Sequence, residues 1–295
     1  MVNRVAIFGQ SFYPETEKYL IQLLTVLDSQ KVEVVVENDY FKLLEKENSI
    51  KGFQKLNTFE SLDESIDLFF TIGGDGTILS AAKFVKHLNI PIIGINTGRL
   101  GFLATIHKDE IKKSIEDILD GHYKISERSL LQVILDSDKS SLGSFSYALN
   151  DVAISRKETT SMITIDTWLD DEFLNAYWSD GIIISTPTGS TGYSLSCGGP
   201  IVTPQTKSFI ITPIAPHNLN ARPLVIPDDI EIKFKISGRE DQYLISLDSR
   251  LASLKKDTIV RIKKADFNIK LVWLHNDSFI TTLRKKLLWG QDKRN

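Results

Sequence analysis

Cysteine is the scarcest chemistry-bearing residue in this chain, because it occurs only once, at Cys197. A single thiol excludes an internal disulfide and a zinc cluster held by cysteines, and it indicates a reducing compartment. The five histidines never take the H-E-x-x-H spacing of zinc hydrolases, which argues against that class of enzyme.

Long apolar runs and an excess of basic charge are also absent. No stretch approaches the roughly 20 apolar residues of a membrane span, and the N-terminus lacks the pattern of a signal peptide. The formal net charge of −3 gives no overall basic field of the kind that marks a nucleic-acid-binding protein. We therefore expect a cytoplasmic protein whose partners are neither membranes nor nucleic acids.

Three widespread motifs are missing as well. The Walker pattern G-x-x-x-x-G-K-[ST] does not occur, and no G-x-G-x-x-G opens a helix, so the sequence supports neither a Walker-type NTPase nor a Rossmann fingerprint. Ser190 lies in the run GSTG, which is not the G-x-S-x-G elbow of hydrolases.

What the chain has is a globular composition and, in its first third, an alternation of strands and helices. Its 295 residues, 42% hydrophobic and 25% charged, suit one large or two ordinary domains. Short apolar runs predict buried strands, and apolar residues at helical spacing predict the helices between them. The expected strands are 4–8, 32–36, 67–72 and 91–95, and the expected helices are 15–29, 40–47, 77–88 and 110–119. This order predicts an α/β domain with an open, parallel sheet.

From about residue 127 the pattern changes to short β-rich runs broken by Gly, Pro, Asp or Ser. The expected strands are 128–136, 144–155, 162–169, 181–186, 208–214, 230–236, 243–247 and 258–263. They predict a mainly antiparallel, all-β second domain. Residues 279–289 return to helical spacing, so we expect this tail to pack back on the first domain. The predicted domains are therefore 1–126 and 127–276, with 277–295 as the returning C-terminal segment.

The stretch DLFFTIGGDGTIL, residues 67–79, departs from ordinary α/β sequence. Its buried strand runs directly into Gly73, Gly74, Asp75 and Gly76, and a helix follows. Glycines at the carboxyl end of a strand allow left-handed backbone angles and the close approach of a ligand. The start of the following helix offers free N–H groups to an anion. The alternative is a tight turn between strand and helix in which the aspartate has no chemical role.

Four further segments combine polar residues and glycines with strand ends. They are GINTGRLGFLATI (94–106) with Gly98 and Gly101, YALNDVAISR (147–156) with Asn150 and Asp151, WSDGIIISTPTGSTGYSLSCGGPIV (178–202) with Asp180, and TPIAPHNLNARPLVI (212–226) with His217. Each has an ordinary interpretation, since hydroxyl-rich loops and Asn-Asp turns are common and a lone histidine is more often structural than catalytic. The position of the hydroxyl-rich loop favours a binding site, because the run IIISTPTGSTGYSLS continues from a buried strand and contains no charged residue. Such a loop suits a flat, hydroxylated, partly anionic ligand.

The motif GGDGT at 73–77, taken with Asn150-Asp151 and TPTGSTGYSLS at 186–196, resembles the NAD kinase family. GGDGT alone is weakly specific, because lipid kinases and phosphofructokinases carry similar turns, whereas the long hydroxyl-rich stretch is strongly specific. The similarity extends from the first strand to Trp289. It implies an α/β domain joined to an all-β sandwich. It also implies transfer of the γ-phosphoryl group of ATP to the 2′-hydroxyl of the adenosine ribose of NAD, giving NADP and ADP.

The resemblance assigns roles to individual residues. Asp75 would be the catalytic residue, as a general base or as a group that helps to hold the metal. Mg²⁺ would bridge the donor phosphates rather than occupy a permanent protein site. Asn150 and Asp151 would grip the acceptor, and Asp180 would contact its nicotinamide half. The other implied substrate-binding residues are Gly76, Thr191, Gly192, Tyr193, Ser194, Leu195, Ser196 and Ala215.

Three positions depart from the family pattern and concern the choice of acceptor. Asp151 stands where many members have Glu, which shortens that side chain by one methylene, Gly192 stands where Ala is common, and Ser179 stands where Gly is frequent. Two other functions stay open on the residues alone: a lipid or sugar kinase that shares GGDGT, and a non-catalytic dinucleotide sensor. The resemblance further implies a homodimer or homotetramer in which a neighbouring subunit completes the nicotinamide side of the site.

Overall fold

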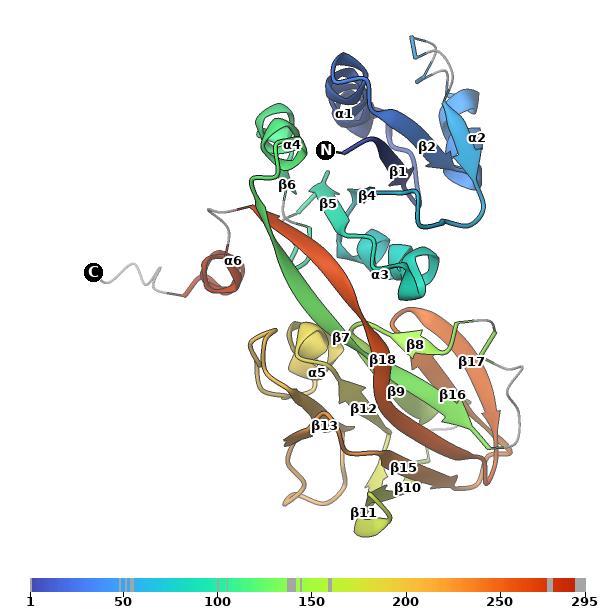
Figure 1. Ribbon diagram of the computed structural model, residues 1–295. Helices are drawn as coiled ribbons and strands as arrows, with labels where there is room; N and C mark the ends of the chain where they lie inside the picture. Colours follow the sequence, from blue (N-terminus) through green and yellow to red (C-terminus); the bar gives the residue numbers. More distant parts are fainter. Residues whose placement is uncertain are drawn as a thin grey trace. The chain divides into compact units, whose positions relative to one another are not determined.

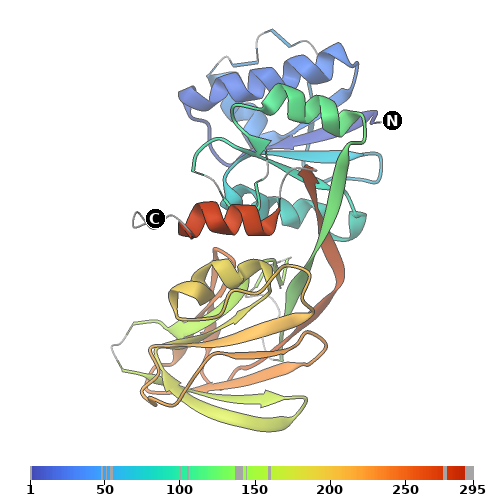
Figure 2. The same cartoon turned by 90° about the vertical axis from the view of Figure 1, so that its left-hand side faces the viewer.

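The computed structural model divides the chain into two compact units (Figures 1 and 2). Unit 1 is Met1–Glu127 with Ile269–Asn295, and unit 2 is Arg128–Asn268. The structure describes residues 2–47, 49–50, 52–53, 56–99, 101–104, 106–136, 142–143, 145–158, 161–274 and 278–289. The chain passes from one unit to the other within two long strands, β7 (Tyr123–Leu135) and β18 (Ile259–Leu274).

Unit 1 is built on a parallel sheet. Its strands are β1 (Arg4–Phe8), β2 (Glu33–Glu37), β3 (Asn57–Phe59), β4 (Leu68–Gly73), β5 (Ile92–Asn96) and β6 (Ile106–His107). The order is β5-β4-β1-β2-β3, the end of β18 pairs with β5 at Leu271, and β6 also pairs with β5. The helices are α1 (Glu17–Ser29), α2 (Asn38–Lys46), α3 (Asp75–Val85), α4 (Ile111–Leu119) and α6 (Phe279–Leu287).

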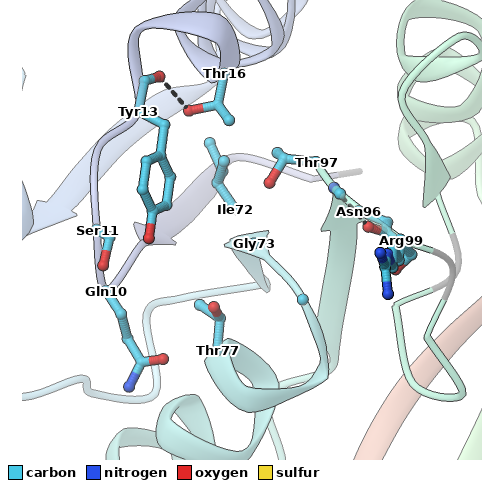
Figure 3. Close-up of a pocket in the computed structure, with 12 residues that line it drawn as sticks. Gln10, Ser11, Tyr13, Thr16, Ile72, Gly73, Thr77, Asn96, Thr97 and Arg99 are labelled. Carbon is cyan, nitrogen blue, oxygen red and sulfur yellow. Dashed lines mark hydrogen bonds between the residues drawn. The ribbon is translucent and has the colours of Figure 1, made fainter.

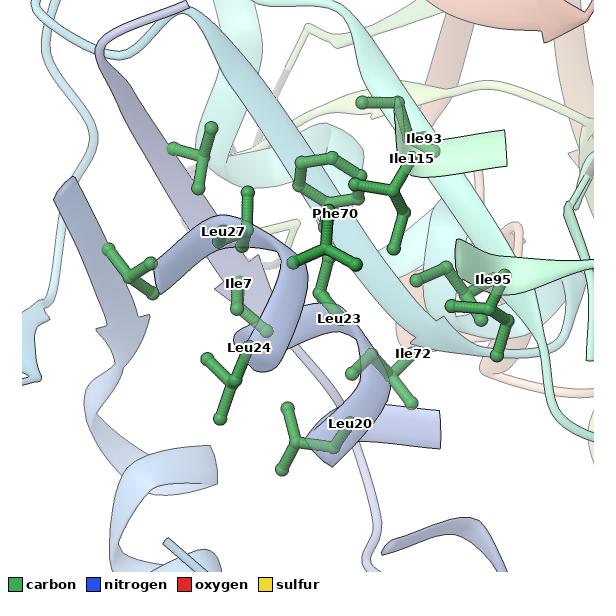
Figure 4. Packing of buried hydrophobic residues seen from close by; sticks show 14 of the residues in the cluster. Ile7, Leu20, Leu23, Leu24, Leu27, Phe70, Ile72, Ile93, Ile95 and Ile115 are labelled. Carbon is green, nitrogen blue, oxygen red and sulfur yellow. The ribbon is translucent and has the colours of Figure 1, made fainter. Parts of the chain in front are cut away.

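Both faces of this sheet are covered, which is why β4 is apolar at nearly every position. On one face, Leu20, Leu23 and Leu27 of α1 are buried in a cluster that includes Phe70 and Ile115 (Figure 4). Figure 2 shows α1 and α4 side by side over this face. Because successive strand residues point to opposite faces, the residue before Phe70 faces the other way. The aromatic cluster on that second face consists of Phe8, Phe59, Phe69 and Phe84, with neighbouring ring centroids 5.2–6.3 Å apart.

Helix α6 belongs to unit 1. Its first turn is capped by Ser278, whose hydroxyl accepts a hydrogen bond from the N–H of Thr281 at 3.1 Å. The ring of Phe279 lies 6.2 Å from the ring of Phe102, and Nζ of Lys286 lies 5.4 Å from the same ring. These contacts attach the C-terminal helix to the loop that follows β5.

Unit 2 is a β-sandwich. Its strands, besides β7 and β18, are β8 (Tyr147–Ala148), β9 (Asp151–Arg156), β10 (Ile163–Leu169), β11 (Glu172–Ser179), β12 (Gly181–Ser185), β13 (Ser208–Ile214), β14 (Leu224–Pro227), β15 (Ile232–Ser237), β16 (Gln242–Leu247) and β17 (Arg250–Lys255). One sheet is antiparallel in the order β14-β13-β12-β9-β16-β17, and strands β11-β10-β15-β18 lie in the other. Buried side chains such as Ile154, Ile184 and Phe234 fill the space between them.

The predicted fold class, a parallel α/β domain joined to an all-β sandwich, is confirmed. Several boundaries differ in ways that bear on the site. The expected strand 144–155 is divided, because β8 ends at Ala148 and β9 begins at Asp151. The expected strand 258–263 is only the start of the 16-residue β18. Within the described residues, no helix is both long and apolar enough to cross a membrane.

Candidate active site

A cavity of about 270 Å³ lies at the carboxyl ends of strands β1, β4 and β5 in unit 1 (Figure 3). Its lining residues are Gln10, Ser11, Tyr13, Thr16, Ile72, Gly73, Gly74, Thr77, Asn96, Thr97, Gly98 and Arg99. Hydroxyls, backbone groups and one guanidinium therefore dominate its wall. Carboxyl ends of parallel strands are where open α/β sheets bind their ligands.

A buried asparagine fixes the turn that follows β5 at the cavity. Oδ1 of Asn96 accepts the N–H of Gly98 at 2.9 Å, and its Nδ2 donates to the carbonyl of Arg99 at 2.9 Å. Asn96 is only 2% exposed, so the turn is fixed from inside. This arrangement holds Thr97 and Arg99 at the cavity wall (Figure 3).

Of the glycines of GGDGT, Gly73 is the one that the backbone requires where strand β4 meets helix α3. Gly73 has φ +151°, and a Cβ there would lie 2.2 Å from Oγ1 of Thr77. Gly74 is the N-cap of α3 and has no side chain to cap the helix. The N–H of Thr77 donates to the carbonyl of Gly74 at 3.0 Å, but the N–H groups of the first two helical residues have no acceptor within the helix and can bind an anion. Gly76 has nothing within 4 Å of its Cβ position, so it adds open space.

Asp75 is held by the backbone of the loop after β5. Its Oδ2 accepts the N–H of Phe102 at 2.7 Å, and its Oδ1 accepts those of Leu103 and Ala104 at 3.0 and 3.2 Å. A Cβ at Gly101 would lie 1.9 Å from Oδ1, so only glycine lets this loop approach the carboxylate. A carboxylate offers about four lone-pair sites, and three N–H bonds leave one acceptor site for another group.

In unit 2, Asn150 and Asp151 lie at the start of β9, against the hydroxyl-rich loop. The carbonyl of Asn150 accepts the N–H of Thr186 at 2.9 Å, and the Thr186 hydroxyl donates to the carbonyl of Leu149 at 2.6 Å. A Cβ at Gly189 would lie 2.1 Å from the carbonyl oxygen of Asn150. Glycine at 189 is therefore needed for the loop to pack on this segment.

The side chains of Asn150 and Asp151 converge on Gly192. A Cβ at Gly192 would lie 3.7 Å from Oδ2 of Asp151 and 3.8 Å from Nδ2 of Asn150. Neighbouring residues in a regular strand point to opposite faces, but the bend between β8 and β9 removes that restriction. Oδ1 of Asn150 is buried and has no hydrogen-bond partner within the described part of the chain. A buried acceptor without a hydrogen bond costs free energy, and this one suits a donor on a bound molecule.

Asp151 is 6% exposed and carries an altered pKa. Burial, followed by the nearby charge of Asp248, raises the pKa of Asp151 to about 7. Its carboxyl group therefore changes charge near neutral pH, far above the range of an ordinary aspartate.

The hydroxyl-rich loop contains a 3₁₀ turn at Thr188–Thr191 and the short helix α5 (Tyr193–Ser196). Several of its hydroxyls make hydrogen bonds within the protein. Ser190 donates to the carbonyl of Pro187 and accepts the N–H of Val202, and the buried Ser194 hydroxyl bonds that of Thr212 at 2.8 Å. The more accessible residues among those predicted are Thr191, Gly192, Tyr193, Leu195 and Ser196.

Asp180 lies where β11 leads into β12, and Arg156 holds it. Nε and Nη2 of Arg156 lie 3.0 and 3.3 Å from the two carboxylate oxygens of Asp180. The N–H of Asp180 donates to the carbonyl of Ile214 at 3.0 Å, which brings Ala215 close in the chain. Ala215 has φ +44°, an uncommon angle for a residue with a side chain.

His217 follows on the same loop and packs on an exposed tryptophan. The centroid of its ring lies 4.3 Å from that of Trp178, and its backbone N–H donates to the carbonyl of Trp178 at 2.9 Å. Trp178 is 50% exposed. The segment around Asp180 therefore carries an aromatic surface beside an ion pair.

The structure thus groups the sequence-predicted residues by unit. Asp75 and Gly76 lie together in unit 1, and the remaining predicted residues lie in unit 2. Sequence reasoning missed Asp248 and Arg156 and did not identify Gly101 as the neighbour of Asp75. Asp248 reads as part of an ordinary turn in LDSRL, and its partners are 97–99 residues away. In the described part of the chain, no three acidic, histidine or cysteine side chains gather as metal ligands would.

Sequence comparison finds two family profiles along this chain. The ATP-NAD kinase N-terminal domain matches residues 5–123, and the ATP-NAD kinase C-terminal domain matches residues 149–274. A protein of Christiangramia forsetii named NAD kinase is 55% identical over 294 residues, covering 99% of this chain and 100% of its own length. The Flavobacterium johnsoniae protein of the same name is 50% identical over 293 residues, again covering 99% and 100%.

Two solved structures have the same fold. Yeast NADH kinase complexed with NADH gives a TM-score of 0.85 at 25% identity, covering 99% of this chain and 89% of that one. An NAD kinase from Archaeoglobus fulgidus in complex with ATP gives a TM-score of 0.74 at 24% identity, covering 97% and 98%. The similarity therefore extends over both units.

Proposed function

Since the chain belongs to the ATP-NAD kinase family, we propose that it transfers the γ-phosphoryl group of ATP to the 2′-hydroxyl of the adenosine ribose of NAD. The products are NADP and ADP. The observation that carries this proposal is the Asp75 carboxylate, which three N–H groups hold while one acceptor site stays free, in the turn whose Gly73 and Gly74 line the cavity. Family membership supplies the identity of the two substrates.

We propose that the cavity of unit 1 receives the phosphates of ATP. Phosphate oxygens need N–H donors, hydroxyls and positive charge, and the cavity offers the start of α3, the hydroxyls of Ser11, Thr77 and Thr97, and the guanidinium of Arg99. Gly73 and Gly74 let the ligand come close to the backbone at this point.

We propose that Mg²⁺ binds as part of the donor substrate. Phosphoryl transfer requires neutralisation of charge on the donor phosphates, and a Mg²⁺ ion that bridges them supplies it. The three N–H bonds to Asp75 occupy most of its lone-pair sites, so the carboxylate fits a role toward a hydroxyl better than the role of a principal metal ligand.

The role proposed for Asp75 is that of the general base. A free carboxylate site can accept the proton of the attacking hydroxyl as its oxygen bonds to phosphorus. The N–H bonds fix the orientation of the carboxylate, which keeps that site in one direction. Phosphoryl transfer depends mainly on positioning of this kind.

The acceptor NAD would bind through the residues of unit 2. Asn150 and Asp151 face one point beside Gly192, and the unpartnered Oδ1 of Asn150 suits a hydroxyl or amino donor of the adenosine half. Tyr193 is 48% exposed and can supply an aromatic surface for the adenine. Asp180 and Ala215 would meet the nicotinamide half, with Arg156 fixing the carboxylate of Asp180.

We further propose a cytoplasmic homo-oligomer, a dimer or tetramer. Strands β14 and β17 are edges of the six-stranded sheet, and Leu251 on β17 is 72% exposed. Edge strands with exposed apolar side chains are commonly covered by another chain. Light scattering, combined with specific activity measured on dilution, tests this assembly, and full activity of a strict monomer would refute it.

The experiment that tests the function is an acceptor panel. The protein is incubated with ATP and Mg²⁺ and with NAD, a diacylglycerol or a sugar phosphate, and an NADP-specific dehydrogenase detects NADP. We expect NADP from NAD and no phosphorylated lipid or sugar. Phosphorylation of a lipid or sugar alone would assign another kinase, and NAD binding without turnover would assign a sensor.

A further inference from the structure

An aspartate far along the chain organises the pair Asn150 and Asp151. Asp248 is a half-buried residue at the turn between β16 and β17, and its carboxylate faces the bend between β8 and β9. Its Oδ1 accepts the N–H of Asn150 at 2.7 Å and that of Asp151 at 3.3 Å, and its Oδ2 accepts the N–H of Leu149 at 3.1 Å. Three consecutive backbone donors thus end on one carboxylate.

Asp248 also donates a hydrogen bond back to the segment that it holds. The N–H of Asp248 donates to the carbonyl of Asp151 at 2.9 Å. Asp248 itself has φ +54°, so the turn holds it in the left-handed region. Asp248 and the segment 149–151 therefore bond each other in both directions, through the N–H groups of 149–151 and through the carbonyl of Asp151. The two segments are about 100 residues apart in sequence.

This set of bonds explains why two neighbouring side chains face the same point. A regular strand through 149–151 would send one of the two side chains away from Gly192. Three N–H groups that converge on one carboxylate cannot belong to a regular β ladder, in which alternate N–H groups point to opposite edges. The Asp248 carboxylate therefore stabilises the bend that brings Asn150 and Asp151 together.

We propose that Asp248 is a positioning residue for the acceptor substrate, acting through the backbone of 149–151 to aim Asn150 and Asp151 at NAD. The inference rests on the proposed function, because it concerns the acceptor of that reaction. Asp248 itself would not touch the substrate. Its removal should impair NAD binding selectively and leave the ATP site, built from unit 1 residues, unaffected.

The same carboxylate also acts on the charge of Asp151. Burial raises the pKa of Asp248, while its N–H bonds and Arg250 act in the opposite direction. Because both Asp248 oxygens accept N–H bonds, Asp151 is the member of the pair that takes up the proton. The other titratable groups whose charge couples to Asp151 are Tyr193 and Cys197. Ionised Asp151 is an acceptor only, so NAD binding through it should weaken as pH falls below about 7.

The test compares Asp248→Asn and Asp248→Ala with a matched control, Asp257→Asn. Asp257 also lies at a turn with left-handed backbone, φ +61°, but its ion pair, with Lys235 at 4.0 Å, is exposed. Asn at 248 keeps the oxygen that serves two N–H groups, so it should partly rescue the Ala variant. We expect KM for NAD to rise about tenfold or more in Asp248→Ala, as expected for lost charged hydrogen bonds, and less in Asp248→Asn. KM for ATP should stay within about twofold.

The pH profile supplies the readout that a purely structural role would not move. In the native protein, kcat/KM for NAD should fall below pH 7, and in Asp248→Asn this acid limb should shift to lower pH, because one negative charge is removed. Both pH profiles are measured on proteins whose folding has first been verified by a thermal unfolding curve. If Asp248→Ala does not fold, Asp248→Asn and the native profile decide the question.

Unchanged KM for NAD and an unchanged acid limb in Asp248→Asn would overturn the proposal. An equal rise of KM for both substrates would also overturn it, because that pattern indicates general loosening. Failure of the proposed function is a different result: the native protein would then form no NADP at any pH, whatever the variants do.

Discussion

The side chain of Asp75 occupies the space that any side chain at Gly101 would need, since a Cβ at position 101 would lie 1.9 Å from Oδ1 of Asp75. The two residues come from different elements, the start of α3 and the loop after β5. Their proximity lets the N–H groups of 102–104 reach the carboxylate. The GGDGT turn and the GRLGFLA segment therefore form one structural unit around Asp75.

Replacing Gly101 by alanine should displace the Asp75 carboxylate while leaving the rest of unit 1 intact. A misplacement of about 1 Å can cost on the order of 10²-fold in rate, so we expect a fall in kcat of that size. Gly52→Ala is the control, because nothing lies within 4 Å of a Cβ there. Steady-state kinetics on both variants checks this, and normal turnover by Gly101→Ala would show that the contact has no catalytic importance.

Asp75→Asn should lose most turnover, because an amide cannot accept the proton of the 2′-hydroxyl. General-base catalysis contributes about 10²–10⁴-fold, so we expect kcat to fall within that range. Asp67→Asn is a matched control, since Asp67 also accepts two backbone N–H bonds, from Asn3 and Arg4. It should lose comparable stability and keep its kcat. Turnover by Asp75→Asn within about threefold of the native value would remove the base assignment.

The regular elements of unit 1 could be predicted because they are strongly patterned. The run at β4 is apolar on both faces, and α1 buries leucines at helical spacing. Strand β11 was missed, because its residues are mostly exposed or half-buried and no alternation stands out. Most of β18 was missed for a similar reason: Lys263, Lys264 and Asp266 interrupt its apolar pattern.

The residues of the candidate site stay a prediction from the sequence, and the groups that hold those residues in place could not be predicted from it. Unusual local composition singled out Asp75, Asn150 and Asp151. The groups that hold them are long-range partners, such as Asp248, and ordinary turn chemistry gives no sign of such a partner in the sequence. The bend before β9 likewise depends on a contact between distant segments, so periodicity alone predicts one continuous strand there.

Asn150→Ala should weaken NAD binding without loss of stability. Its Oδ1 is buried without a partner among the described residues, a cost of about 1–3 kcal/mol that the substitution removes. We expect an unchanged or higher Tm together with about tenfold weaker binding of NAD, measured by calorimetry. Affinity equal to that of the native protein would return this residue to a purely structural role.

Asp151 should make stability depend on pH in a definite direction. Its pKa is about 7 in the folded protein and about 4 when unfolded, so between these values the folded state binds more protons. The free energy of unfolding therefore falls as pH rises from about 4 to 7. Asp151→Asn should remove this loss and raise stability above pH 7, by on the order of a few kcal/mol.

Thermal unfolding at pH 5 and pH 8 checks this expectation. The Tm difference between Asp151→Asn and the native protein should be large at pH 8 and smaller at pH 5. Equal differences at the two pH values would mean that Asp151 does not titrate near neutrality. The same variant should bind NAD more weakly, which would show that the native aspartate is retained for binding rather than for stability.

Transfer of the terminal phosphoryl group of ATP to the 2′-hydroxyl of NAD can be followed with labelled donor. The protein is incubated with Mg²⁺ and ATP labelled in the γ-phosphate, together with either NAD or its 2′-deoxyadenosine analogue, and the dinucleotides are separated. We predict label in NADP from NAD and none in the deoxy analogue. Label in the analogue, or none in any dinucleotide while NAD binds, would show that the 2′-hydroxyl of NAD is not the acceptor.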